Sequence, residues 1–194
     1  LGIAAFPARL AYGMISLGIF FKAEQSTDSF AIAGFAIGLN SLAGAVTAGI
    51  RGSIMDRWGQ KWPLRILVPG YTIMILALNQ MDTARSILIT AFLLGISAPP
   101  INLSVRPLWK DIVPATYLRT AYAFDSAMMS STSVVGPVVV TALALSSRPY
   151  LALDVTAALM ITGGIALALT PVSRNWIPEK KIKGQERLLQ SRAI

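Results

Sequence analysis

Long apolar stretches alternate with short polar stretches along the whole chain. Six of them approach the length that crosses a bilayer, which takes roughly 20 apolar residues in a helix. Backbone groups in hydrocarbon need partners within the protein, and the alternation of a membrane β-barrel is absent, so we predict helices. The pattern indicates an all-α membrane protein with spans over residues 3–21, 30–50, 64–81, 86–105, 121–145 and 150–170.

Proline and glycine lie inside several of these spans. Neighbouring helices can satisfy the backbone groups that proline frees, so we expect Pro69-Gly70 and Pro99-Pro100 to bend the third and fourth spans. Small residues also let membrane helices approach closely. We therefore expect close helix packing at the glycines of the second span, which are Gly34, Gly38, Gly44 and Gly49.

The composition agrees with a lipid environment. Of the 194 residues, 54% are hydrophobic and 13% are charged, whereas a soluble domain carries about 25% charged residues. The chain has no Cys and no His. The first absence excludes disulfides and thiolate chemistry, and the second removes the commonest metal ligand and general base. We expect no metal site and no cofactor.

The basic residues gather on one side of the predicted bundle. Most of the 17 Lys and Arg residues lie in the even-numbered loops and the C-terminal tail, namely Arg51, Arg57, Lys61, Arg65, Arg106, Lys110, Arg119, Arg174, Lys180, Lys181, Lys183, Arg187 and Arg192. The odd-numbered loops hold Lys22, Arg85 and Arg148. By the positive-inside rule, both chain ends are cytoplasmic in a multi-pass protein of the cell (plasma) membrane. The net charge of +8 is explained this way, without a nucleic-acid partner.

The segment between the second and third spans has a specific spacing of glycine, acidic and basic residues. It reads GSIMDRWGQK over residues 52–61. This segment resembles the signature loop of the major facilitator superfamily of transporters, and it departs from that pattern at Gln60, where a basic residue is usual. The matching positions are Gly52, Asp56, Arg57, Gly59 and Lys61.

The resemblance implies a twelve-helix protein of two halves, with a substrate site near the midplane between them. Residues 1–171 would form the N-terminal six-helix half, and residues 172–194 resemble the start of the central cytoplasmic linker. Asp56 would help to lock the two halves together in the outward-open state, with Arg57 as its charged neighbour. The alternative is a basic cytoplasmic turn without such a role. In the fifth span, Gly136 and Pro137 are similar to the Gly-Pro motif of family antiporters, and a proline-bent helix explains them equally well.

Ionisable groups inside a membrane are costly, so each is a functional candidate. Arg9, Tyr12 and Ser16 share one helix face and would suit an anionic or polar solute; alternatively, Arg9 snorkels to the headgroups. Asp125 lies roughly 9 Å into the fifth span, where it could carry a proton or form a structural pair with a basic group. Asn40 is a further candidate for the wall of the cavity.

The leading hypothesis is secondary active transport of a small solute by alternating access, with proton-coupled efflux as one form of it. The alternative is a non-transporting six-helix protein or truncated half that binds partners. An intramembrane enzyme is not expected, because Cys and His are absent and no Lys lies inside a predicted span. The expected partners are the bilayer, a small solute and a second six-helix half.

Overall fold

The computed structural model describes residues 2–175 of the chain, and all regular structure in that part is helical. The elements are α1 (Gly2–Thr27), α2 (Phe30–Trp58), α3 (Lys61–Asn79), α4 (Ala84–Ser97), α5 (Ile101–Ile112), the short 3-10 helix η1 (Ala115–Tyr117), α6 (Leu118–Ala144), α7 (Leu151–Leu169) and α8 (Pro171–Asn175). The predicted linker lies outside the described residues from position 176 on.

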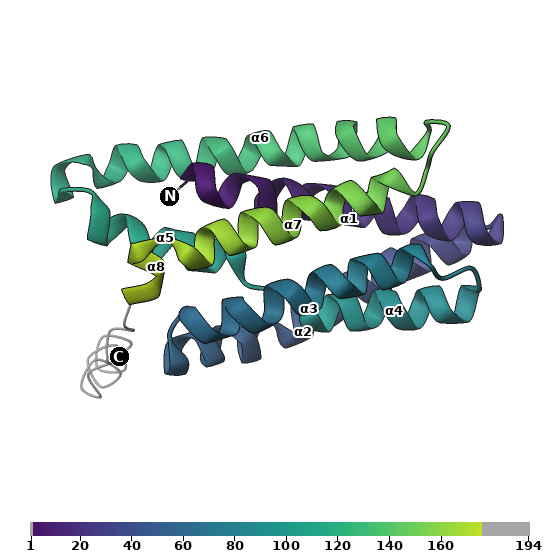
Figure 1. Cartoon of the computed structure of the whole chain (residues 1–194), viewed down its shortest axis with the longest axis horizontal. Helices are drawn as coiled ribbons and strands as arrows, with labels where there is room; N and C mark the ends of the chain where they lie inside the picture. The colour runs from purple at the N-terminus through teal and green to yellow at the C-terminus, as the bar shows by residue number, and fades with distance from the viewer. Residues whose placement is uncertain (1, 176–194) are drawn as a thin grey trace, which may run out of the picture.

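The predicted all-α membrane class is confirmed. Five of the described helices are long and apolar enough to cross a membrane, and α4 is a shorter apolar helix. The six predicted spans correspond to α1, α2, α3, α4 with α5, α6, and α7. The helices run side by side along the long axis, with the N-terminus, α5 and α8 at one end (Figure 1).

Two predicted loops are largely helical. α1 continues through the polar residues to Thr27, and α2 continues to Trp58. The prediction of a ten-residue loop over residues 52–61 was therefore wrong, because α2 continues through most of it and α3 begins at Lys61. Gly59, with φ of 73°, ends α2. A side chain would be strained at that backbone angle, which explains glycine there.

The fourth span is broken into two helices. α4 ends at Ser97 and α5 begins at Ile101, with Pro99 and Pro100 between them. Proline has no N–H to donate and disfavours helix in the residue before it, so two successive prolines stop the helix. The predicted bend of this span is thus a full interruption. α3, by contrast, continues through Pro69 as one helix.

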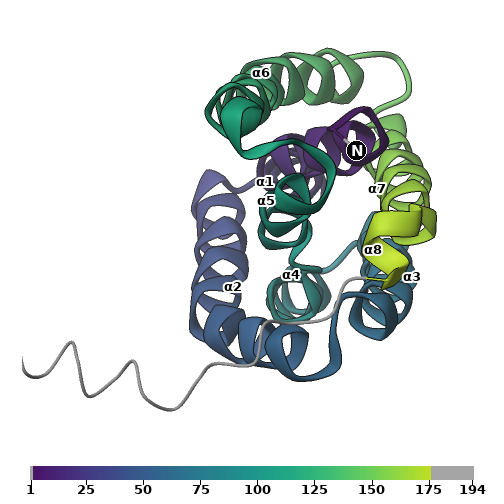
Figure 2. The ribbon, with the colours of Figure 1, turned by 90° about the vertical axis from the view of Figure 1, so that its left-hand side faces the viewer.

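α1 lies at the centre of the packing. It contacts α7, α6 and α2, and Figure 2 shows the other helices arranged around it and α5. Close approach depends on glycines whose missing Cβ would meet a neighbouring backbone: Gly13 and Gly136 face each other between α1 and α6, Gly163 faces Ala8, and Gly95 faces Asn40. Membrane helices gain stability from such contacts because van der Waals packing drives their association.

The glycines of α2 behave differently from the prediction. A Cβ at Gly34, Gly38 or Gly49 would meet nothing within 4 Å, and one at Gly44 would make only an ordinary contact. Phe35, Leu42, Val46 and Ile50 on the same helix are exposed. The expectation of close packing at these glycines was therefore wrong within this bundle, because the closely packed glycines named above lie on α1, α4, α6 and α7.

Candidate functional site

Arg9 of α1 and Asp125 of α6 form a buried ion pair. Nη1 of Arg9 lies 2.8 Å from Oδ1 of Asp125, and the two residues are 2% and 1% exposed. Each lies seven residues beyond the start of its helix, which is about 10 Å along the axis. The alternative that Arg9 snorkels to the headgroups is therefore wrong in this conformation. Asp125 has the basic partner that the structural alternative required, and that partner comes from α1.

Two other nitrogens of Arg9 have no hydrogen-bond partner. Nε and Nη2 are buried and unpaired within the part of the chain that the structure describes. A buried donor left unpaired costs on the order of 1–3 kcal/mol, and a guanidinium presents a planar fork that suits carboxylate or phosphate. The pair therefore leaves Arg9 with donors that another acceptor could use.

Tyr12 lies near Arg9 on α1 but bonds to a different element. Its hydroxyl donates to the carbonyl oxygen of Pro99, in the break between α4 and α5. The ring of Tyr71 in α3 lies 5.9 Å from the ring of Tyr12. Ser16, predicted on the same face, is exposed. The residues predicted to share one helix face thus make different contacts, because Arg9 contacts α6 and Tyr12 contacts the break between α4 and α5.

Arg51 also reaches this break, and sequence reasoning placed it in a basic loop. It lies inside α2, and Nη1 donates to the carbonyl oxygen of Ala98. Nη2 donates to the carbonyl oxygen of Gly44 at 2.6 Å. The carbonyl of Ala98 is one that a helix end leaves free, whereas Gly44 lies within α2 itself. The sequence did contain a signal for this contact. Arg51 directly follows the predicted second span, and Pro99-Pro100 in the fourth span predicts carbonyls without helical partners that an arginine could bind.

The other two candidate positions have structural contacts. Nδ2 of Asn40 donates to the carbonyl oxygen of Ala91 at 3.0 Å, which joins α2 to α4. Gly136 lies against the backbone of Gly13, where an added Cβ would come within 2.7 Å. Pro137 follows inside the continuous helix α6. The Gly13 contact shows that Gly136 packs α6 closely against α1.

The signature segment forms the last turns of α2 and the turn into α3. Asp56 and Arg57 are exposed, whereas Gln60 is a buried polar member of the segment, 1% exposed. Nε2 of Gln60 donates to the carbonyl oxygen of Ser104 in α5 at 2.9 Å, and its Oε1 accepts from the hydroxyl of Ser173 in α8 at 3.4 Å. Gln60, the residue that departs from the family pattern, therefore joins the α2–α3 turn to α5 and α8.

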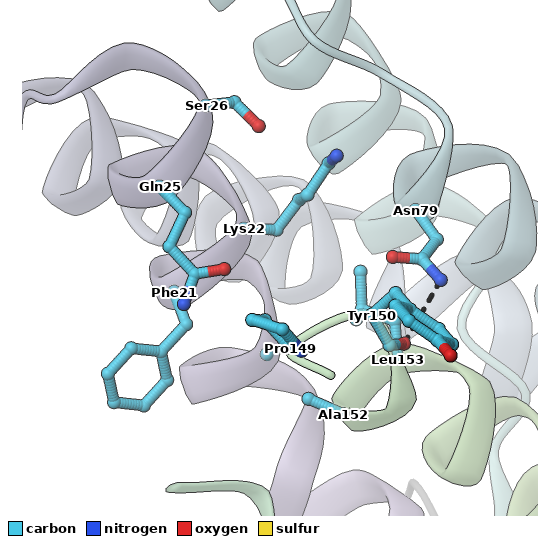
Figure 3. A pocket seen from close by; sticks show the side chains of 10 residues that line it. Phe21, Lys22, Gln25, Ser26, Asn79, Pro149, Tyr150, Ala152 and Leu153 are labelled. Atoms are coloured by element: carbon cyan, nitrogen blue, oxygen red, sulfur yellow. Dashed lines mark hydrogen bonds between the residues drawn. The ribbon is translucent and has the colours of Figure 1, made fainter. Parts of the chain in front are cut away.

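A polar pocket of about 130 Å³ lies at the other end of α1. Lys22, Gln25 and Ser26 of α1 approach Asn79 and Tyr150 there (Figure 3). Most of its polar groups bond to the protein: Gln25 donates to the carbonyl oxygen of Ala144, Asn79 donates to Asp154 and to the carbonyl oxygen of Tyr150, and Lys22 pairs with Asp82 at 3.1 Å. This end of the bundle is tied together by polar contacts.

The charged groups buried in the described part of the bundle are few. Within the described residues, no group of three or more His, Cys, Asp or Glu side chains could hold a metal ion. Among the described residues, the charged side chains buried in the membrane spans are Arg9 and Asp125, and they pair with each other. Such residues in membrane proteins mark solute, ion and proton paths.

Comparison with known proteins agrees with the signature segment. The model of the Major Facilitator Superfamily matches residues 1–193. No curated protein and no solved structure matches the chain. That match covers nearly the whole chain, and the described part is an all-helical bundle with a broken fourth span. The chain therefore belongs to the Major Facilitator Superfamily of membrane transporters.

Proposed function

We propose that the chain is the N-terminal six-helix half of a secondary transporter that moves a small polar or anionic solute by alternating access. The observation that carries the proposal is the buried pair of Arg9 and Asp125, 2.8 Å apart between α1 and α6. In transporters of this kind, the two halves rock about a central site near the midplane. A charge pair between two spans can change partners as those spans move.

The exchange of partners at Asp125 is the proposed coupling step. Removing one member of a buried pair leaves the other charge uncompensated, which costs about 3–5 kcal/mol. A proton on Asp125 would release Arg9, and the carboxylate or phosphate of a solute could then accept from its guanidinium. The free Nε and Nη2 donors of Arg9 support a solute of this charge. Efflux coupled to proton entry is the direction we propose.

The second half of the transporter would dock on surfaces that this bundle leaves open. The face of α2 with Gly34, Gly38 and Gly49 has nothing against it, and Asp56 at the end of α2 is exposed. An exposed Asp56 is available to contact the other half as the proposed cytoplasmic lock. We further propose that both chain ends lie in the cytoplasm and that the protein lies in the plasma membrane, as the distribution of basic residues favours.

Alternating access can be tested before the solute is known. The chain has no Cys, so a single Ser16→Cys change reports on the exposed middle of α1. We expect a membrane-impermeant maleimide to label this position from each side of sealed vesicles that contain the protein, in a ratio that depends on pH. Labelling by a lipid-soluble maleimide alone would place Ser16 in hydrocarbon and contradict a water-filled path.

The proposed coupling role of Asp125 is tested by comparing two further variants, both made in the Ser16→Cys background. Asp125→Asn should remove the pH dependence of the labelling ratio, because the group that exchanges the proton is gone. Asp111→Asn makes the same chemical change at an exposed carboxylate of α5 and should retain the dependence. An unchanged pH response in Asp125→Asn would refute proton coupling through this residue while leaving alternating access standing.

A further inference from the structure

A groove between α3 and α7 lies apart from the residues proposed for transport. It holds about 230 Å³. Its walls are aliphatic except for Arg65, and include Val68, Pro69, Ile165 and Ala168. The volume is below the 300–1,000 Å³ of a typical pocket for a whole small molecule. A segment of a flexible apolar chain fits it better.

The surface around the groove is itself apolar. Ile66 of α3 is 67% exposed, and Leu169 of α7 is 55% exposed. In a membrane protein such residues face hydrocarbon, so the occupant of the groove comes from the bilayer. The groove ends at Arg65, one turn before Pro69 on α3 and close to the α2–α3 turn. The apolar groove therefore has a cation, Arg65, at one end.

Lys61 is a second cation near Arg65, and both side chains lie close to the ring of Trp62. The ring of Trp62 lies 6.0 Å from Cζ of Arg65 and 5.7 Å from Nζ of Lys61. Trp62 is 57% exposed, and tryptophan is enriched where hydrocarbon meets headgroups. Within the described residues, neither cation has a carboxylate at ion-pair distance. The mouth of the groove thus carries two positive charges that no carboxylate of residues 2–175 compensates at ion-pair distance.

We propose that this groove binds one anionic phospholipid of the cytoplasmic leaflet. An acyl chain lies between α3 and α7, and the phosphate lies against Arg65 and Lys61. Charge complementarity selects the anionic headgroup, since each basic residue near the surface favours an anionic lipid about fivefold. The groove selects a lipid over a free phosphate, which has no tail to bury there.

The test is native mass spectrometry of the protein in detergent, titrated with phosphatidylglycerol or with phosphatidylcholine of the same acyl chains. We expect the first lipid adduct to form with phosphatidylglycerol at roughly twentyfold lower concentration, because two basic residues contribute. The double variant Lys61→Gln with Arg65→Gln should lose this preference and still bind phosphatidylcholine. A matched loss of two exposed cations from α5, Arg106→Gln with Lys110→Gln, should retain the preference.

The groove is tested separately from the headgroup. Ile165, 44% exposed, can accept a larger side chain, so Ile165→Trp should fill the groove and weaken binding of both lipids several-fold. In the unmodified protein, high salt should reduce the preference and inorganic phosphate at the lipid concentration should leave the adduct in place. Equal losses in the two double variants would show a general surface charge effect, and unchanged binding in Ile165→Trp would show a headgroup contact alone. Either result would overturn the proposal.

Discussion

The guanidinium of Arg51 in α2 donates to the carbonyl oxygen of Ala98, directly after the last residue of α4. The same group donates to Gly44, in its own helix, and weakly at 3.4 Å to Gly95. A helix end leaves up to four carbonyls without partners, and a cation there also interacts favourably with the helix dipole. Arg51 thus supplies, from another helix, hydrogen-bond donors for carbonyl oxygens at the end of α4.

Replacing Arg51 should destabilise the bundle. Arg51→Ala leaves carbonyls of α4 unpaired, and we expect it to lower the free energy of unfolding by about 1–3 kcal/mol. Arg51→Lys keeps the charge but lacks the fork, so its loss should be smaller. Unfolding in detergent, followed by tryptophan fluorescence, measures both. Arg57→Ala, an exposed cation two turns later, is the control and should stay within about 0.5 kcal/mol.

The pair of Arg9 and Asp125 should behave as a coupled unit. Arg9→Gln and Asp125→Asn should each cost about 3–5 kcal/mol, because each strands a buried charge. The double variant should cost clearly less than the sum of the two single variants. A complete double-mutant cycle of unfolding free energies measures this coupling. Additive costs would mean that the two side chains do not stabilise each other in the membrane-embedded protein.

The contact of Gly136 with Gly13 predicts a strong size limit between α1 and α6. In Gly136→Ala the new Cβ would come within 2.7 Å of the Gly13 backbone, and such overpacking costs about 1–3 kcal/mol. Gly70→Ala is the matched change in α3, where an added Cβ would meet nothing within 4 Å. It should be neutral or stabilising by up to about 1 kcal/mol. Equal effects on thermal stability would contradict the close approach.

Restoring the usual basic residue of the family at position 60 should weaken this protein. Gln60 is buried and bonds to both α5 and α8. Gln60→Lys places a cation where Ser104 offers only a carbonyl, so we expect a loss of about 2–4 kcal/mol. Ser53→Lys, on the exposed side of α2, is the control for added charge and should change the melting temperature little. An increase in stability with Gln60→Lys would show that the turn can rearrange.

Several features of the site were within reach of sequence reasoning. Arg9 and Asp125 stood out because charge inside an apolar span is expensive. Their pairing was not predictable, since it depends on which faces of α1 and α6 meet. The same limit applies to the glycines. Both Gly34 and Gly136 lie inside apolar spans, and the sequence does not distinguish them. In the structure, Gly136 contacts another backbone and Gly34 faces open space.

The ends of the helices were harder to predict than the spans themselves. Polar residues after an apolar run predict a loop, yet α1 continues to Thr27 and α2 to Trp58. Backbone hydrogen bonding favours a continuing helix wherever no breaker intervenes, and the breakers here are Asp28, with φ of 51°, and Gly59. Polarity marks where a helix leaves the membrane, and it does not mark where the helix ends.

The sequence by itself determined that this protein spans a membrane as helices, and its signature segment indicated the transporter family. These conclusions follow from local properties: the length of each apolar run, the distribution of charge and the spacing within ten residues. Only the tertiary structure decided that Arg9 meets Asp125, that Arg51 and Tyr12 bond to the break after α4, and that Gln60 joins three elements. Those contacts depend on how whole helices rotate and pack against one another, which no single segment specifies.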